Sequence, residues 1–400
     1  MRKRSVVLAL ILVIVGLGGA SFAVADGREG AIHVFPGKYR GGRMPEAGLV
    51  FDAYGNLYGT TSAGGVANAG VVFELTPQMG NRWLYTQLYA FQGGSDGEYP
   101  AGALVVDQAG NLYGTTEGGG IHSAGIVFEL IQGTDGTWTE KVLQYFGGTN
   151  GSNPTDLVFD GAGNLYGTAD PNVYELSPND DGTWTETVLY SFISGGNTEI
   201  PRGPLVFDAY GNLYGVTEAG GAFGWGTVFE LSPLTGESWA ENTLYNFLQN
   251  PDDGVQPFSG VIFDGAGDLF GVTPAGGGAN GDGFGTVYEL KPSGSGWTEA
   301  VIHRFHPNRG DGSEPFGAPV LDSAGNLYGT TYGGGSAGEG IVFRLAAMPD
   351  GLWSELRYSF VSESSGYMPA GGVILDVSGN LYGGTSAGGD GWGVIYKLIP

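Results

Sequence analysis

The chain has 400 residues, of which 41% are hydrophobic, 78 are glycine and none is cysteine. Its formal net charge of −25 makes nucleic acid and anionic membrane surfaces poor partners. The absence of cysteine excludes disulfides, thiolate metal sites and cysteine nucleophiles, so packing must supply the stability.

Residues 1–25 have the pattern of a secretory signal peptide. A basic segment from Arg2 to Arg4 precedes an apolar run from Val6 to Leu17, and Ala23-Val24-Ala25 forms an A-x-A cleavage site. The alternative is an uncleaved membrane anchor, but the run is shorter than the ~20 residues of a spanning helix. We expect a secreted protein, extracellular or periplasmic, without membrane attachment after signal removal. Cleavage would leave 13 basic and 41 acidic residues, a charge of −28.

From residue 31 onward the chain repeats one five-residue motif seven times. Six copies read Gly-Asn-Leu-Tyr-Gly and one reads Gly-Asp-Leu-Phe-Gly. The central residues, 48 to 58 positions apart, are Asn56, Asn111, Asn164, Asn212, Asp268, Asn326 and Asn380. Such self-similarity indicates one repeat architecture rather than several unrelated domains. We therefore interpret residues 26–400 as a single domain.

Each repeat unit contains four apolar runs of strand length, separated by Gly, Pro, Asn and Asp clusters. In the second unit the predicted strands are 104–107, 111–116, 126–130 and 138–146. Four antiparallel strands in each of seven units predict an all-β, seven-bladed β-propeller.

The ends of the chain favour a closed ring over the alternative, a solenoid of β-turns. The last unit stops after its third strand, 394–398, while an unassigned run at 31–35 resembles a fourth strand. We expect residues 31–35 to pair with 394–398 and complete the last blade, which leaves no exposed edge at the seam.

The motif Asp-x-x-Gly-Asn-Leu-Tyr-Gly-Thr, followed by a double-glycine loop and Gly-x-Val-Phe-Glu-Leu, resembles the GloVer tandem repeat of exported bacterial proteins. The resemblance covers nearly all of residues 31–400 and implies an exported repeat protein without an established activity. We expect the chain to differ from that family in lacking a C-terminal sorting segment. A weaker likeness to NHL and related propeller repeats supports four strands per blade.

An aspartate ends the first strand of every unit. These residues are Asp52, Asp107, Asp160, Asp208, Asp264, Asp322 and Asp376. Each carboxylate can accept N–H bonds from the turn that it opens, and the glycine three residues later permits positive φ. Carboxylate oxygens also suit calcium, the one cofactor that we consider for this chain. Because a single ligand site does not require the same residue in every unit, we favour turn capping and expect no cofactor.

Aromatic and charged residues at repeated strand positions have structural interpretations. Six fourth-strand tryptophans are expected to pack between sheets: Trp83, Trp138, Trp184, Trp239, Trp297 and Trp353. His33 and His303 replace a tyrosine of other units, and we interpret them as packing aromatics. The third-strand glutamates are expected in solvent: Glu74, Glu129, Glu175, Glu230 and Glu289. Trp225 and Trp392 instead lie between glycines in loops, so we select them as candidates for stacking on sugars.

The third unit has lost the loop between its second and third strands. Tyr174 follows Tyr166 by eight positions, whereas the equivalent residues of the other units are 14 to 18 positions apart. The loss predicts a notch in the rim that carries the connections between blades. The candidate ligand-binding residues around it are Glu117, Asp156, Asp170, Arg202 and Glu218. Carboxylates from adjacent blades could bind a cation or act as an acid and base, or could simply keep an acidic protein soluble.

The expected channel walls, from strands such as 49–51, 104–106 and 373–375, are apolar, and the chain has only four histidines. We therefore predict a monomeric, non-catalytic binding module for an extracellular carbohydrate or protein, with neither catalytic residues nor a metal. Two alternatives remain open. One is a polysaccharide lyase or hydrolase that uses the acidic cluster at the notch, and the other is a structural component of the cell envelope.

Overall fold

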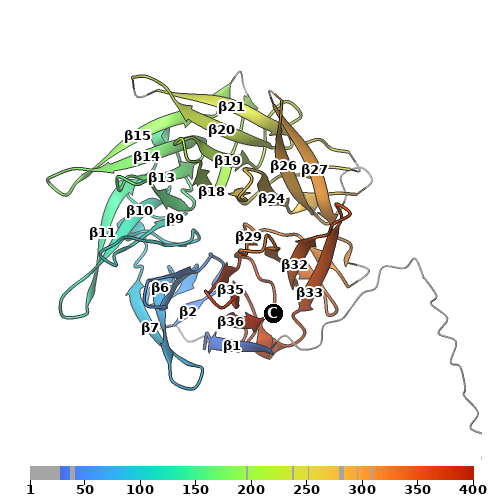
Figure 1. The fold of residues 1–400 in the computed structure, drawn as a ribbon. Helices are drawn as coiled ribbons and strands as arrows, with labels where there is room; N and C mark the ends of the chain where they lie inside the picture. Colours follow the sequence, from blue (N-terminus) through green and yellow to red (C-terminus); the bar gives the residue numbers. More distant parts are fainter. Residues whose placement is uncertain are drawn as a thin grey trace, which may run out of the picture.

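The computed structural model describes residues 28–36, 41–194, 197–236, 238–250, 252–278, 283–294, 296–307 and 310–400. The predicted signal peptide lies outside these ranges. Seven four-stranded antiparallel sheets stand around a central axis as the blades of a propeller (Figure 1). The prediction of a seven-bladed, all-β propeller is confirmed. Within the described ranges, no helix has the length and apolar character needed to cross a membrane.

Every blade has the same strand order from the axis outward. The innermost strands are β3 (Val50–Phe51), β8 (Val105–Val106), β12 (Leu157–Phe159), β18 (Pro201–Phe207), β23 (Ile262–Phe263), β29 (Val320–Leu321) and β34 (Ile374–Leu375). The second strands are β4 (Leu57–Thr61), β9 (Leu112–Thr116), β13 (Leu165–Ala169), β19 (Leu213–Thr217), β24 (Leu269–Thr273), β30 (Leu327–Thr331) and β35 (Leu381–Thr385). The third strands are β6 (Val71–Gln78), β10 (Ile126–Gln132), β14 (Asn172–Pro178), β20 (Thr227–Pro233), β26 (Thr286–Ser293), β32 (Ile341–Ala347) and β36 (Val394–Ile399). The outermost strands are β7 (Arg82–Ala90), β11 (Trp138–Tyr145), β15 (Trp184–Ser191), β21 (Trp239–Asn246), β27 (Gly296–Arg304), β33 (Trp353–Ser359) and β1 (Arg28–Val34).

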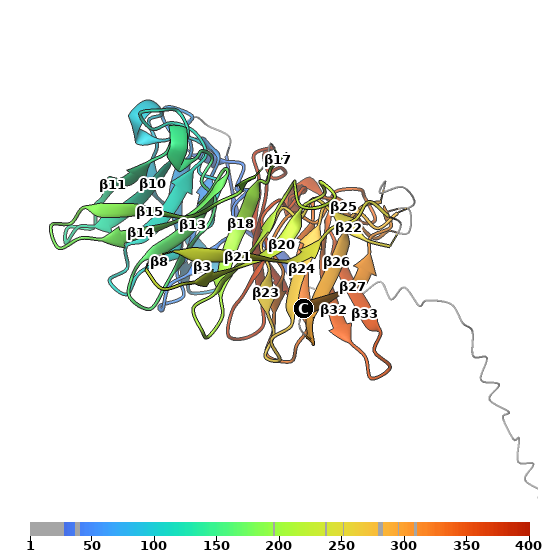
Figure 2. The same ribbon diagram turned by 90° about the horizontal axis from the view of Figure 1, so that it is seen from above.

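Connections between blades and loops after second strands share one face of the propeller, which we call the connector face (Figure 2). Three small strand pairs join a connection to such a loop there: β2 (Gly42–Arg43) with β5 (Ala63–Gly64), β22 (Gly254–Val255) with β25 (Ala275–Gly276), and β28 (Gly312–Ser313) with β31 (Gly333–Gly334). The connection into blade 4 carries its own hairpin, β16 (Ile193–Ser194) with β17 (Asn197–Thr198).

The N-terminal strand closes the ring as expected. β1 pairs antiparallel with β36, with Ala31 opposite Tyr396 and Val34 opposite Val394. The strand begins at Arg28, three residues before the predicted start. The two strands lie side by side at opposite ends of the colour range in Figure 1. The chain therefore forms a closed ring and not a solenoid.

The repeated aspartates cap their turns, as predicted. Oδ1 of Asp322 accepts hydrogen bonds from the backbone N–H groups of Ala324 and Asn326, both at 2.9 Å. Its Oδ2 accepts from Asn326 Nδ2 at 2.7 Å and from the Tyr328 hydroxyl at 3.1 Å. Gly325 has a φ of 80°, a value that glycine adopts at little cost. Although burial opposes the shift, these bonds lower the pKa of Asp322.

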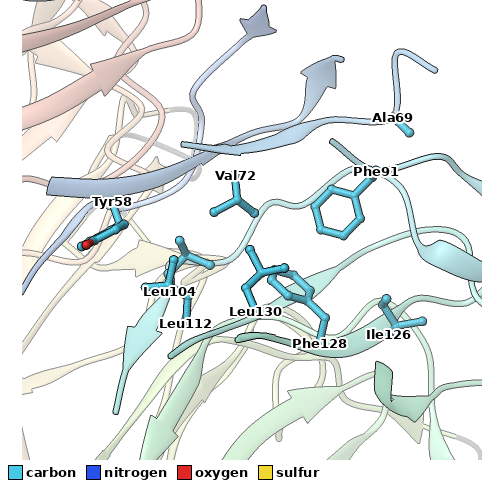
Figure 3. Close-up of a cluster of buried hydrophobic side chains, with 9 residues drawn as sticks. All are labelled: Tyr58, Ala69, Val72, Phe91, Leu104, Leu112, Ile126, Phe128 and Leu130. Carbon is cyan, nitrogen blue, oxygen red and sulfur yellow. The ribbon is translucent and has the colours of Figure 1, made fainter. Parts of the chain in front are cut away.

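The hydrophobic core lies between adjacent blades. Figure 3 shows the cluster between blades 1 and 2, in which Val72 and Phe91 face Phe128 and Leu130. The outer-strand tryptophans join these layers. The Trp184 ring of blade 3, for example, packs edge to face on the ring of Tyr113 in blade 2, with the ring centroids 6.1 Å apart. The prediction that they pack between sheets is confirmed. Each blade is thus stabilised mainly by its neighbours.

The third-strand glutamates were expected in solvent, and for two of them this is wrong. Glu129 and Glu289 are each only 8% exposed. Glu129 lies opposite Tyr113 across the sheet and accepts a 2.8 Å hydrogen bond from its hydroxyl. A neighbouring hydroxyl provides the partner that a buried carboxylate needs, which strand alternation alone does not reveal.

A carboxyl pair lies at the junction of blades 4 and 5. The Tyr245 hydroxyl donates a 2.8 Å hydrogen bond to Oδ2 of Asp253, which is 3% exposed. Glu299, on the outer strand of the next blade, has a buried Oε1 without a hydrogen-bond partner. Burial, followed by the nearby Asp253, raises the pKa of Glu299 to about 7. Tyr89, Asp96 and Glu140 repeat the arrangement between blades 1 and 2.

Glu299→Gln should stabilise the protein at pH 8 and have little effect at pH 5. A carboxyl group whose pKa is raised on folding favours the folded state below its unfolded value near 4.5, and this contribution is lost as the pH rises through about 7. Glutamine removes the charge that forms above pH 7. Urea midpoints of both proteins at the two pH values test this. An equal shift at both values would contradict the titration of Glu299.

Candidate functional site

A cavity of about 920 Å³ lies on the propeller axis. Its wall includes apolar side chains of the innermost strands or of the residues beside them, such as Leu49, Leu157, Ile262, Val320 and Val373. The prediction of an apolar channel is confirmed for these positions. Polar groups that could act on a ligand therefore come from the connector face, where the cavity has its mouth.

The mouth is formed by one repeated position, the residue directly after the proline of each inter-blade connection. In blade order these residues are Glu46, Ala101, Thr155, Arg202, Phe258, Phe316 and Ala370, and all seven line the cavity. The residue after the second strand adds Ser62, Glu117 and Tyr332 to the lining. Because the repeat fixes the place but not the residue type, the mouth differs around its circumference.

Arg202 is the centre of the charged side of the mouth. Its NH2 nitrogen lies 3.3 Å from Oδ2 of Asp170, and its Nε donates to Oε2 of Glu218 at 3.1 Å. The side chains of Arg202 and Asp170 are each 19% exposed and that of Glu218 is 29% exposed. The structure thus brings together three of the residues selected from the sequence, across blades 3 and 4.

Two carboxyl groups beside Arg202 are electrostatically perturbed. The Glu117 side chain is exposed, yet partial desolvation of the carboxyl group raises the pKa of Glu117. The positive charge of Arg202 opposes this shift, whereas the negative charges of Glu46 and Asp170 add to it. Burial likewise raises the pKa of Asp170 against the effect of Arg202. Oδ1 of Asp170 is buried without a hydrogen-bond partner. Leaving this oxygen without a donor adds to the cost of ionising Asp170 in its buried position.

Asp156 also lines the cavity but has a positioning role. Its Oδ1 accepts a 2.7 Å hydrogen bond from the backbone N–H of Ala103, in the preceding blade. Burial raises the pKa of its carboxyl group. Asp156 thus ties blade 3 to blade 2 beside the cavity.

The opposite side of the mouth is aromatic. The rings of Phe258 and Phe316 are 5.7 Å apart, and those of Phe316 and Tyr332 are 6.0 Å apart, both edge to face. The Arg202 guanidinium lies 5.7 Å over the Phe258 ring and joins the two sides. Phe258 is 40% exposed. A ligand at the mouth would meet aromatic rings on one side and carboxylates on the other.

Residues with positive φ hold the mouth in place. Tyr99 and Glu314, which precede inter-blade prolines, have φ values of 60° and 59°. The N–H of Glu314 donates to the Phe284 carbonyl of the preceding blade, and its own carbonyl accepts from Tyr332 N–H, both at 2.9 Å. Tyr99 accepts from Glu117 N–H in the same way at 3.0 Å. Such backbone strain is retained where the surrounding structure determines the conformation.

Trp225 and Trp392 lie apart from this cavity. In each case the backbone carbonyl of the tryptophan accepts a 2.9 Å hydrogen bond from the connection that leads to the next blade. The donors are the N–H of Gln256 for Trp225 and the N–H of Met44 for Trp392. Both rings are partly buried against hydrophobic clusters, and the Arg43 guanidinium lies 4.5 Å over Trp392. One part of each ring is thus engaged in packing, and the stacking of sugars on Trp225 and Trp392 stays a prediction.

The aromatic side of the mouth was not selected from the sequence. The signal was present, since Phe258 and Phe316 directly follow inter-blade prolines, as Arg202 does. Comparing this position across all seven repeats would have found them.

A family model described as Gloeobacter/Verrucomicrobia repeat matches residues 19–173 and 169–396. No curated protein matches. Among solved structures, virginiamycin B lyase from Staphylococcus aureus is 12% identical with a TM-score of 0.55, over 94% of this chain and 99% of that one. A streptogramin B lyase is 14% identical with a TM-score of 0.57, over 93% and 97% of the two chains. At such identities the likeness shows the fold alone.

Proposed function

The chain belongs to the Gloeobacter/Verrucomicrobia repeat family, as its resemblance to the GloVer repeat implied, and we propose that it is a secreted protein that binds extracellular carbohydrate at the mouth of its channel. The observation that carries the proposal is the two-sided mouth. Aromatic rings can pack against the apolar face of a sugar, while carboxylates accept bonds from its hydroxyls. A protein ligand is the alternative partner.

The charge of the mouth narrows the carbohydrate class. Glu46, Glu117 and Glu314 line the cavity, and Asp170 and Glu218 flank Arg202, the single cation among these groups. A polyanionic glycan would meet like charge from the mouth and from a chain of net charge −25. The ligand is therefore a neutral or amino-sugar glycan.

Glycan cleavage is a second candidate, because Glu117 has a raised pKa beside the ion-paired Asp170 and Glu218. A carboxyl group with a raised pKa near further carboxyl groups is the arrangement from which acid and base catalysis is built. The apolar channel wall supplies no further catalytic group, so binding is the first proposal.

Wild-type protein should be retained on at least one of cellulose, mannan, xylan, chitin and chitosan, and not on polygalacturonate. Phe316→Ala should weaken retention at least tenfold, about 1.4 kcal/mol. Phe223→Ala is the matched control, because Phe223 is 58% exposed and lies outside the cavity lining. Retention on none of the glycans, or equal loss in both variants, would overturn the proposal.

Cleavage is tested by measuring new reducing ends in each glycan after incubation. Reducing ends that the wild type releases and Glu117→Gln does not would establish cleavage.

A further inference from the structure

A histidine stands at the junction of blades 5 and 6 where four other junctions place tyrosine. His303 on β27 takes the position of Tyr89, Tyr190, Tyr245 and Tyr358. Its Nε2 lies 3.2 Å from Oδ2 of Asp311 and 3.9 Å from Oε1 of Glu355, on β33 of the next blade. In the described part of the chain, these residues form the one group of three His, Asp or Glu side chains with ligand atoms within 4.8 Å of one another. The interpretation of both histidines as packing aromatics is confirmed: the His303 ring packs edge to face on Phe305 at 4.7 Å, and the His33 ring stacks on Tyr85 at 4.2 Å. At His303 the carboxylates of Asp311 and Glu355 are an additional feature.

The two carboxylates have distinct inner and outer oxygens. On the outer side, Arg357 NH1 lies 3.2 Å from Oε2 of Glu355 and 3.6 Å from Oδ1 of Asp311, which also accepts a 2.7 Å bond from Gly312 N–H. On the inner side, Oδ2 of Asp311 and Oε1 of Glu355 face His303. The outer contacts orient both groups, as outer-shell partners do around metal ligands.

One inner oxygen lacks a partner. Oε1 of Glu355 is buried without a hydrogen-bond partner, and the Asp311 side chain is only 7% exposed. The carboxylates of Asp311 and Glu355 carry two negative charges against the one positive charge of Arg357, so the group has a net negative charge when the His303 imidazole is neutral. A buried charge of this kind is costly unless it is paired, and a cation among the inner atoms would pair it.

The blade 4/5 junction shows what the histidine changes. There the Tyr245 hydroxyl donates a hydrogen bond to Asp253, and the group has two carboxyls but no nitrogen ligand. An imidazole nitrogen instead offers a lone pair. Nitrogen and carboxylate donors together suit zinc, with bond lengths of about 2.0–2.2 Å and donors roughly 3.4 Å apart in a tetrahedral site. The 3.2 and 3.9 Å separations at His303 are near that value.

We propose that His303 Nε2, Asp311 Oδ2 and Glu355 Oε1 bind one zinc ion that links blade 5 to blade 6. The His303 and Glu355 side chains are each 17% exposed, so solvent reaches the site. The ion joins an outer strand and a connection of one blade to the outer strand of the next. Because only the folded protein brings these donors together, zinc also stabilises the fold.

The test is zinc titration of the untagged protein, freed of metal with chelator, by calorimetry and thermal unfolding. We expect one zinc per chain and a higher melting temperature with zinc. His303→Tyr, which reproduces the blade 4/5 junction, should keep the fold, lose saturable binding and lose the thermal shift. His122→Ala removes an exposed imidazole in blade 2 and should bind as the wild type does.

A gain-of-site variant makes the test independent of how well His303→Tyr folds. Tyr245→His places an imidazole beside Asp253 and Glu299 and should raise the stoichiometry from one zinc to two. The proposal is overturned if the wild type binds no zinc, or if His303→Tyr still binds one ion per chain with unchanged affinity. It is also overturned if loss of binding in His122→Ala assigns the ion to blade 2.

Discussion

Phe35→Ala should lower the free energy of unfolding by about 3–5 kcal/mol, the cost of deleting a fully buried phenylalanine ring. Phe35 is 0% exposed, directly after the closing strand β1. Its ring lies 5.5 Å from that of Phe73 in blade 1, and its N–H donates to the Gly393 carbonyl in blade 7 at 3.1 Å. The substitution therefore weakens both sides of the seam. Guanidinium unfolding followed by tryptophan fluorescence measures the effect.

Val34→Ala is the matched control for the seam. Val34 is the last residue of β1, next to Phe35, but is 38% exposed. Its truncation should therefore lower the free energy of unfolding by less than about 1 kcal/mol. Comparable losses in the two variants would show that general weakening of β1, and not burial of the Phe35 ring, determines closure.

Arg202→Met should destabilise the protein by about 1–3 kcal/mol at pH 7.5, and this loss should shrink at pH 4. Removing one partner of a fully buried ion pair costs about 3–5 kcal/mol, and the partial exposure of these side chains reduces that figure. The guanidinium favours the ionised form of Asp170. Its contribution is present above the pKa of that carboxyl and is lost as the pH falls through it. Thermal unfolding across this pH range measures the difference.

Arg82→Met removes the same charge from an exposed position on β7 and is the control for Arg202→Met. It should have little effect at either pH. If both variants lose equal stability, the ion pairs of Arg202 with Asp170 and Glu218 do not stabilise the mouth. Loss of glycan retention in Arg202→Met alone would additionally connect the charged side of the mouth to ligand binding.

The fold could be predicted because its determinants are local and repeated. The aspartate and the glycine three residues later specify each turn through bonds between positions two and four residues apart. The seven copies then fix the number of blades. Closure by β1 was also readable, since 31–35 supplies the strand pattern that the last unit lacks.

The sites were less predictable because their members come from separate repeats. Asp170, Arg202 and Glu218 were found through the missing loop of blade 3. The partners of His303 were not: Asp311 lies in a connection and Glu355 in the next blade. Sequence position gives the blade of each residue but not the direction of its side chain across a junction. For that reason the same repeat position holds an imidazole stacked on a tyrosine at His33 and an imidazole facing two carboxylates at His303.

The pairing of β1 with β36 also governs the order of events as the protein folds. Val34 and Val394 are partners in the sheet although about 360 residues separate them along the chain. During synthesis β1 leaves the ribosome early and has no partner until the C-terminal strand follows. The intervening blades can assemble locally, whereas the seam must wait for the slowest, longest-range contact in the molecule. Until then blade 7 presents an unpaired strand edge, which makes this interval the one in which the chain is most exposed to aggregation.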